Sequence, residues 1–247
     1  MIGKFSSRDN RLVLAALPTL VYWVLSALYA GVRHFVRGQE MSSTTEGDDN
    51  KNKNRAHPLF VAMSVLSQQC LHCMFGFLLL DASVSRNTVT RGFGRSAVSF
   101  LCAMILLDAY QYHFHALMHA NGWLYRNIHA THHRIASPYA FAALYVHPIE
   151  SILLDGASGL FACAASGLAA QPILCSIFLC LSTAKTVSDH SGLELCGHPL
   201  YDPLMLFFRN NSQYHALHHS LGRGRGKMHL SQPYLTVWDQ WYNSRRG

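Results

Sequence analysis

Apolar positions are concentrated in four long stretches, and polar segments separate them. Residues 12–32, 59–80 and 96–114 each have the length of a membrane-spanning helix, because about 20 residues at about 1.5 Å per residue cross a hydrocarbon core of about 30 Å. Residues 12–32 start too late and run too long for a cleaved signal peptide, so we expect a retained span. The fourth stretch, 149–187, suits a hairpin of two segments that breaks near Gln171 and Pro172. The pattern predicts an all-α membrane protein with three spans plus a helical hairpin.

The remaining segments complete the predicted organisation. Residues 1–11 form an N-terminal tail, 33–58 a polar linker, and 115–247 a C-terminal region that includes the hairpin 149–187. Three successive crossings place the linker and the start of the C-terminal region on the same side of the bilayer. Thirteen Lys and Arg residues are expected on that side and six on the other. The positive-inside bias therefore predicts that the C-terminal region faces the cytosol.

Composition and charge support a membrane protein and argue against a nucleic-acid partner. Half of the 247 residues are hydrophobic and 13% are charged, about half the charged fraction of an ordinary soluble domain. The net charge of +7 comes from basic residues beside the spans, with little aromatic surface among them, which favours membrane lipid or an acidic protein as the partner. The seven cysteines are odd in number and lie mostly in apolar segments, which argues against a disulfide framework.

Histidines form three short boxes after the third span. HALMH contains His115 and His119, HATHH contains His129, His132 and His133, and HALHH contains His215, His218 and His219; these are eight of the sixteen histidines. In a helix, residues i, i+3 and i+4 share one face, so each box directs its rings to a common region. Eight imidazoles exceed the four ligands of a structural zinc site. We therefore predict two metals in one site, with the middle ring of each HxxHH box reaching a neighbouring metal.

Further residues are candidates for the same site. His190 is the favoured ninth ligand, and His147 is a candidate either for a tenth ligand or for a supporting role. Asp108, seven residues before His115, could accept a hydrogen bond from the outer N–H of a ligating ring, or bond within the helix bundle. Asp189, next to His190, is a further candidate. The other histidines have no partner at ligand spacing, so we expect surface or core roles for them: His34, His57, His72, His113, His198 and His229.

The boxes and their surroundings resemble the fatty acid hydroxylase/sterol desaturase superfamily of membrane di-iron enzymes. The resemblance extends beyond the boxes to LYRNIHATHHRIASPYAFAALYVHPIESILLDG, STAKTVSDHSG and NNSQYHALHH followed by SQPYLTVWDQ. These stretches look like the sphingoid-base C4-hydroxylase branch, and together the resemblance covers residues 18–238. The chain departs from the common pattern at Ala116, Val146 and Ala216, which leaves all eight box histidines in place and bears on substrate choice.

This resemblance implies O2-dependent hydroxylation at C4 of sphinganine or dihydroceramide, giving phytosphingosine or phytoceramide. It also implies two iron ions in the catalytic region 115–247, a multi-pass location in the endoplasmic reticulum membrane, and electrons from NAD(P)H through cytochrome b5 and its reductase. The sequence contains no flavin, haem-attachment or dinucleotide motif that would supply those electrons. Glu150 and Asp155 are expected to support the site or anchor the hairpin. Tyr145, Asn211 and Tyr214 are candidates for shaping the cavity, and no residue is assigned to substrate binding.

Several alternatives use similar residues. A sterol C4-methyl oxidase, a C5-sterol desaturase or a fatty acid 2-hydroxylase would share the boxes, although residues 138–155 favour the sphingoid branch. A membrane metal carrier would place its histidines near the middle of several spans, whereas these boxes follow the spans. A haem protein would need only paired axial histidines.

Overall fold

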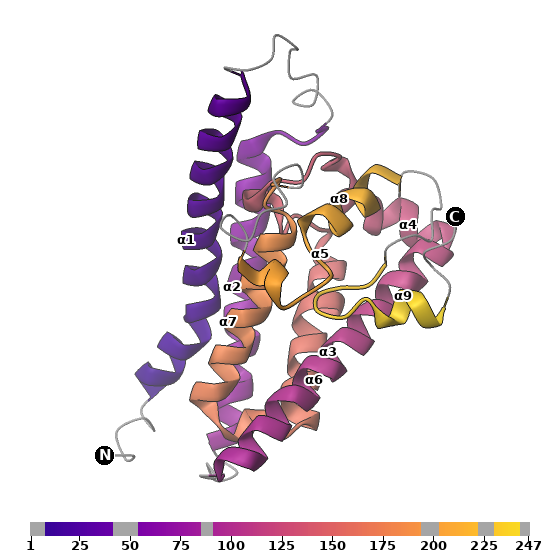
Figure 1. Cartoon of the computed structure of the whole chain (residues 1–247). Helices are drawn as coiled ribbons and strands as arrows, with labels where there is room; N and C mark the ends of the chain where they lie inside the picture. The colour runs from indigo at the N-terminus through magenta and orange to yellow at the C-terminus, as the bar shows by residue number, and fades with distance from the viewer. Residues whose placement is uncertain (1–7, 42–53, 85–90, 194–202, 222–229, 243–247) are drawn as a thin grey trace.

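The computed structural model describes residues 8–41, 54–84, 91–193, 203–221 and 230–242, and its regular structure in these ranges is entirely helical (Figure 1). The predicted all-α class is confirmed. The tail residues 1–7, residues 42–53 of the linker, His198 and His229 lie outside the described residues. The longer helices are α1 (Arg8–Met41), α2 (Pro58–Val84), α3 (Phe93–Ala120), α6 (Ser158–Ala165), α7 (Pro172–Asp189) and α8 (Ser212–Leu221).

Four helical segments are long and apolar enough to cross a membrane: Asp9–Val36, Pro58–Ala82, Phe93–Ala120 and Pro148–Ala165. Their outward faces carry large exposed apolar side chains such as Leu20, Leu78 and Leu101. Such faces suit lipid as the surrounding solvent. By length and composition, the chain is therefore a multi-pass membrane protein.

The hairpin has two helical arms of different character. The first arm consists of α5 (Pro148–Glu150), the π-helix η5 (Ser151–Ala157) and α6, and the second is α7. Between them, Gly167 has a positive φ of 71° and Pro172 occupies the first turn of α7, where its missing N–H costs no helical hydrogen bond. Only the first arm is among the candidate spans, because the second half of α7 carries Thr183, Lys185 and other polar residues.

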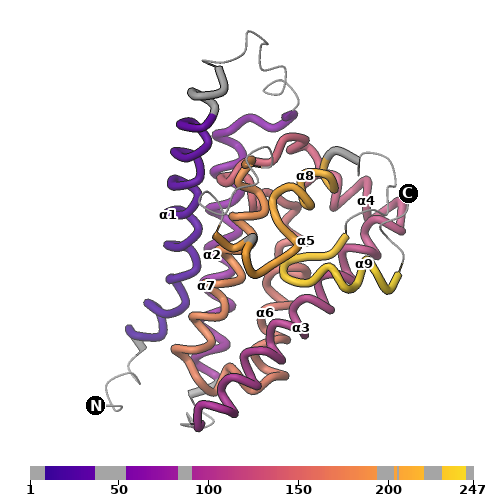
Figure 2. The backbone as a smooth tube through the Cα atoms, in the orientation of Figure 1, coloured from indigo at the N-terminus to yellow at the C-terminus, as the bar shows by residue number. Residues whose placement is uncertain are grey.

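Helices α1, α2, α3, α6 and α7 form the bundle beneath the histidine region (Figures 1 and 2). Helix α1 packs against both α7 and α2, and α3 packs against α6. The buried Ser176 hydroxyl of α7 donates to the Leu14 carbonyl of α1 at 2.8 Å, and Phe100 of α3 meets Phe178 of α7 edge to face. These contacts hold α3 and α7, which both carry site histidines at their ends, in one unit.

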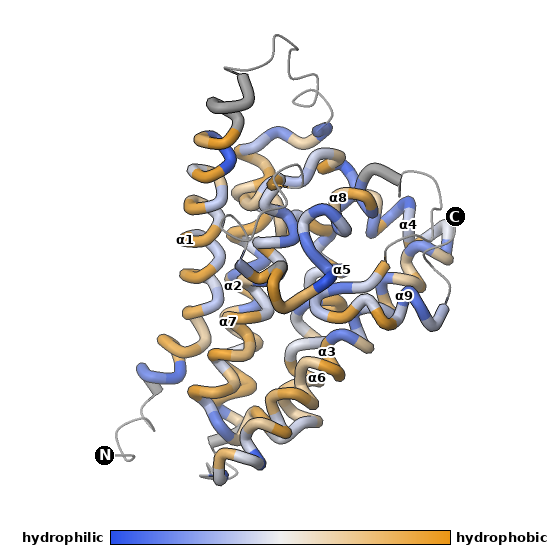
Figure 3. Tube along the Cα trace, in the orientation of Figure 1, coloured by the Kyte–Doolittle hydropathy of each residue, from blue (hydrophilic) through white to orange (hydrophobic). Residues whose placement is uncertain are grey.

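A smaller and more polar cap closes one end of the bundle (Figure 3). It contains α4 (Gly122–Asn127), the 3-10 helix η3 (His129–Arg134), α8 and α9 (Val237–Trp241). The Arg55 N–H, just before α2, donates to the Arg134 carbonyl at 2.9 Å, and Asn54 exchanges two hydrogen bonds with the Ser137 backbone. The end of the linker and the second histidine box therefore lie at the same end of the molecule.

Candidate metal centre

Nine buried histidines converge where the cap meets the bundle, and none is more than 6% exposed. Two come from the last turns of α3, three from η3, one from the C-cap of α7 and three from α8. The second box lies in a 3-10 helix and not in the α-helix that the spacing argument assumed. Eight of the nine are the box histidines, and the ninth is His190, which was proposed from its position after the hairpin: His115, His119, His129, His132, His133, His190, His215, His218 and His219.

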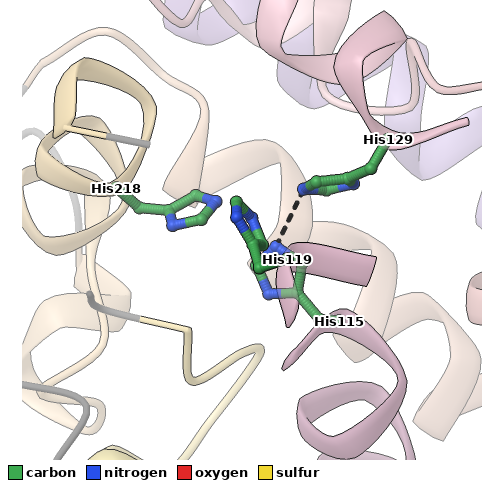
Figure 4. A group of neighbouring side chains, drawn as sticks. All are labelled: His115, His119, His129 and His218. Atoms are coloured by element: carbon green, nitrogen blue, oxygen red, sulfur yellow. Dashed lines mark hydrogen bonds between the residues drawn. The ribbon is translucent and has the colours of Figure 1, made fainter. Parts of the chain in front are cut away.

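Eight of these rings separate into two groups of four. The His115 group consists of His115, His119, His129 and His218, and the His132 group consists of His132, His190, His215 and His219. Within each group the ligand nitrogens all lie within 4.8 Å of one another. Figure 4 shows the His115 group, with rings from α3, η3 and α8 pointing toward one another. The middle ring of each HxxHH box joins the group opposite to its first ring.

His133 lies between the two groups. Its Nε2 atom is 3.0 Å from Nε2 of His129 and 3.3 Å from Nε2 of His119. Its ring centroid is also 5.1 Å from that of His219, in the other group. The His133 ring therefore contacts both the His115 group and the His132 group.

The facing nitrogens have the spacing of metal ligands. Neighbouring Nε2 atoms within the two groups are 2.9–3.5 Å apart. Two nitrogens bound to one ion at about 2.0–2.1 Å are separated by about 2.9 Å at a right angle and by about 3.4 Å at the tetrahedral angle. The Nε2 atom of His129 faces both His115 and His133, although a neutral ring offers only one lone pair at that atom when its other nitrogen carries the proton. The donor set therefore fits two metal ions.

The outer nitrogens of the rings are held by acceptors. His115, His132 and His190 place Nδ1 at 3.0, 3.2 and 2.8 Å from the carbonyls of Leu230, Tyr145 and Thr186. A carbonyl only accepts, so Nδ1 carries the proton and Nε2 keeps its lone pair for a metal. Nδ1 of His129 lies 2.8 Å from the buried Glu150 carboxylate, as expected for a carboxylate that orients a ligating ring.

Electrostatics keep the rings neutral. Burial, with a smaller contribution from the neighbouring rings, holds the pKa of His129, His133, His215 and His219 well below the usual 6.5. Burial likewise lowers the pKa of His190 to about 3. A metal ligand must be deprotonated, so these rings are ready to bind at neutral pH.

Three residues proposed for supporting roles have other partners. His147 lies outside both groups and caps α5, accepting from the Ile149 N–H. Asp108 accepts from the backbone N–H groups of Tyr234 and Leu235 and from the Trp238 indole. It therefore joins α3 to the C-terminal segment and does not hold a ligating ring. Asp189 pairs with the buried Lys185 of α7.

A set of buried polar residues, which was not predicted from the sequence, holds the C-terminal segment. Asp239 accepts from the backbone N–H groups of Leu230 and Ser231 and from the Tyr214 hydroxyl. Asn210 donates to the carbonyls of Ser231 and Pro233. Because the Leu230 carbonyl accepts from His115, these bonds position one ring of the site. The only signal in the sequence was the acid in SQPYLTVWDQ.

Two hollows near the histidines share part of their lining. The metal-side pocket is lined by His129, His132, His190 and His215 together with Glu150 and Asp155. The bundle cavity is lined mainly by apolar residues of α1, α2, α3, α6 and α7. Gln111, Asp155 and Thr186 line both. Together, the fold and the histidine groups define a multi-pass membrane protein with a site for two metals beside an apolar cavity.

Comparison with known proteins identifies the family. Residues 100–244 match the model of the Fatty acid hydroxylase family. The chain is 36% identical over 228 residues to sphinganine C4-monooxygenase 2 of Arabidopsis thaliana, covering 91% of this chain and 83% of that protein. It is 34% identical over 255 residues to sphingolipid C4-hydroxylase sur2 of Schizosaccharomyces pombe, covering 90% and 84%. It is 35% identical over 225 residues to very-long-chain aldehyde decarbonylase GL1-9 of Oryza sativa subsp. indica, covering 90% and 84%.

No solved structure gave a significant match. The chain belongs to the fatty acid hydroxylase family. The resemblance to this family and to its sphingoid C4-hydroxylases is therefore confirmed, and the chain is a membrane hydroxylase of this family. Two different reactions appear in the names of relatives of similar identity.

Proposed function

We propose that this protein uses O2 to hydroxylate C4 of sphinganine or dihydroceramide. The observation that carries the proposal is the pair of four-histidine groups at the end of a largely apolar bundle cavity. A long alkyl chain lies in such a cavity without contacting water, while its polar end stays near the cap. The names of the Arabidopsis and fission yeast relatives support C4 of a sphingoid lipid as the position that reacts.

Each histidine group would hold one iron ion, with His133 between them. Iron bound there supplies the O2 activation that an unactivated C–H bond requires. The chain itself buries nine rings that meet at one site, and the acceptors at Nδ1 of His115, His132 and His190 fix which nitrogen is free. The Glu150 carboxylate holds the His129 ring in place. The surrounding apolar residues exclude water from the reacting carbon.

The proposal includes the source of electrons and the location. Electrons would come from NAD(P)H through cytochrome b5 and its reductase, with the cap facing the cytosol from the endoplasmic reticulum membrane. Arg55, Arg126 and Arg134 near the cap are exposed, and an acidic electron carrier would be attracted to that basic surface.

A lipid assay tests the reaction. The chain is expressed in cells that lack their own C4-hydroxylase and make only dihydrosphingolipids, and the long-chain bases are measured by mass spectrometry. We expect C4-hydroxylated bases from the unaltered chain and none above background from the His218→Ala variant, because His218 belongs to the His115 group. Altered sterols, 2-hydroxy acyl chains or alkanes in place of C4-hydroxylated bases would contradict the proposal. Alkanes would favour the decarbonylase reaction named for the rice relative.

A further inference from the structure

Asp155 lies at the junction between the two hollows of the site. It lines the metal-side pocket with the histidines, and it also lines the bundle cavity with apolar residues such as Leu160 and Leu179. A lipid with its alkyl chain in the bundle cavity and its reacting carbon beside the histidines would lie next to this residue. Asp155 is therefore placed to contact the head of the substrate.

Among the described residues, no hydrogen bond or ion pair holds the Asp155 carboxylate, and His72 is close enough to act on it electrostatically. Three acids line the metal-side pocket, and two of them are engaged: Glu150 with His129, and Asp189 with Lys185. No hydrogen bond or ion pair is formed by the Asp155 side chain with any residue that the structure describes. His72, the nearby histidine on the cavity wall, contacts Ser151 through Nε2. An acid in a membrane-spanning segment is costly without a partner and usually serves function.

The local backbone holds Asp155 in an uncommon conformation. It lies within the π-helix η5, a form that is rare and is frequent at functional sites. The next residue, Gly156, packs closely against α2, since a Cβ there would approach the Phe75 ring to 3.1 Å. Substituting Gly156 would therefore force the ring or the helix to move. This packing fixes the position of Asp155 relative to the histidines.

We propose that Asp155 binds the ammonium group of a long-chain amine, so that the substrate is the free sphingoid base and not its N-acylated form. The inference rests on the proposed function for the identity of the reacting carbon. In a sphingoid base the amino group is on C2, two bonds from C4, so a group that binds the amine lies next to the site of oxidation. N-acylation removes the charge that the carboxylate recognises and adds a second chain. A neutral aldehyde would likewise leave the carboxylate without a counter-charge.

Binding of simple lipids tests this inference without turnover. Purified metal-loaded protein is titrated with octadecylamine and with octadecanol, which share a chain and differ in head-group charge. We expect the unaltered chain to bind the amine at least tenfold more tightly, the Asp155→Asn variant to bind both equally, and Asp155→Glu to regain part of the preference. Metal content and thermal unfolding report whether each variant folds. Equal binding of the two lipids by the unaltered chain, or a preference that survives in Asp155→Asn, would overturn the inference.

Turnover separates this inference from the proposed reaction. With sphinganine and dihydroceramide as substrates, we expect the unaltered chain to prefer sphinganine and Asp155→Asn to lose that preference through a raised KM. If C4-hydroxylated product forms but neither lipid assay shows dependence on Asp155, the amine site is wrong and the reaction stands. If no C4-hydroxylated product forms while the amine preference depends on Asp155, the amine site stands and the reaction is wrong.

Discussion

At the scale of the residue, the partner of the outer ring nitrogen separates a metal-binding histidine from a structural one. His132 donates from Nδ1 to a carbonyl and turns Nε2 toward His190. His147 uses Nδ1 to accept from the Ile149 N–H and stays outside both groups. The two rings are fifteen positions apart and have opposite hydrogen-bonding roles, so they form a matched pair for mutation.

We expect His132→Ala to lose one metal equivalent and more than about 100-fold in activity, beyond the loss typical of residues that merely support a ligand. We expect His147→Ala to keep both metals and to lose only about 0.5–2 kcal/mol of stability, as for other helix N-caps. Metal analysis of the purified proteins and thermal unfolding in detergent provide the two measurements. Loss of metal from His147→Ala, or full metal content in His132→Ala, would contradict the assignment.

At the scale of the element, the C-terminal segment acts as a support for α3. Asp108 of α3 and Asp239 of α9 bind the backbone on either side of Pro233, and the Leu230 carbonyl holds His115. Asp108 and His115, seven residues apart, are both buried residues of α3. The Asp108 carboxylate orders the backbone of the C-terminal segment at Tyr234 and Leu235. It does not hold a ligating ring directly, which was the first role considered for it.

Asp239→Ala should weaken this support. It leaves two buried backbone N–H groups without their acceptor, each costing about 1–3 kcal/mol, and it frees the carbonyl that orients His115, so metal affinity should fall about 10–100-fold. The neighbouring Gln240 is exposed, and Gln240→Ala should stay within about 0.5 kcal/mol of the unaltered chain. Competition with a chelator measures affinity, and thermal unfolding measures stability. Equal behaviour of the two variants would show that Asp239 does not support the site.

At the scale of the whole molecule, the fold predicts which side of the membrane the histidine site faces. Arg134 is exposed beside the second box, and Arg95 is exposed at the start of α3. Since α3 is a candidate span that ends in the first box, these residues should lie on opposite sides of the bilayer. The bias of basic residues then predicts the cytosol on the Arg134 side.

Single cysteines test this orientation. In sealed microsomes, a membrane-impermeant maleimide should label Arg134→Cys at once, and label Arg95→Cys only after permeabilisation, because only the cytosolic face is accessible in intact vesicles. Labelling of the unaltered chain gives the background from native cysteines. The reverse pattern would place the site on the lumenal side.

Much of the helical content and most of the ligand set could be predicted because both depend on residues that are close together in the sequence. An apolar run longer than a bilayer is thick specifies a spanning helix wherever it occurs, and histidines three or four residues apart share a face. His190 was predicted only from its position after the hairpin. The Leu230 carbonyl could not be predicted, because it bonds to His115 at a separation of 115 residues. Asp239 supports the site only through Leu230, so its role could not be predicted either.

The sequence by itself determined the helical membrane class, the family and the histidines that meet. Tertiary structure alone decided how the rings divide, since each HxxHH box contributes its middle ring to the opposite group. It also decided which acid orients a ligand, namely Glu150 and not Asp108, and it left Asp155 facing the junction of two hollows. The reason is physical: helix periodicity fixes the direction of a side chain relative to its own axis, but only the packing of α3, η3, α7 and α8 fixes which side chains face one another.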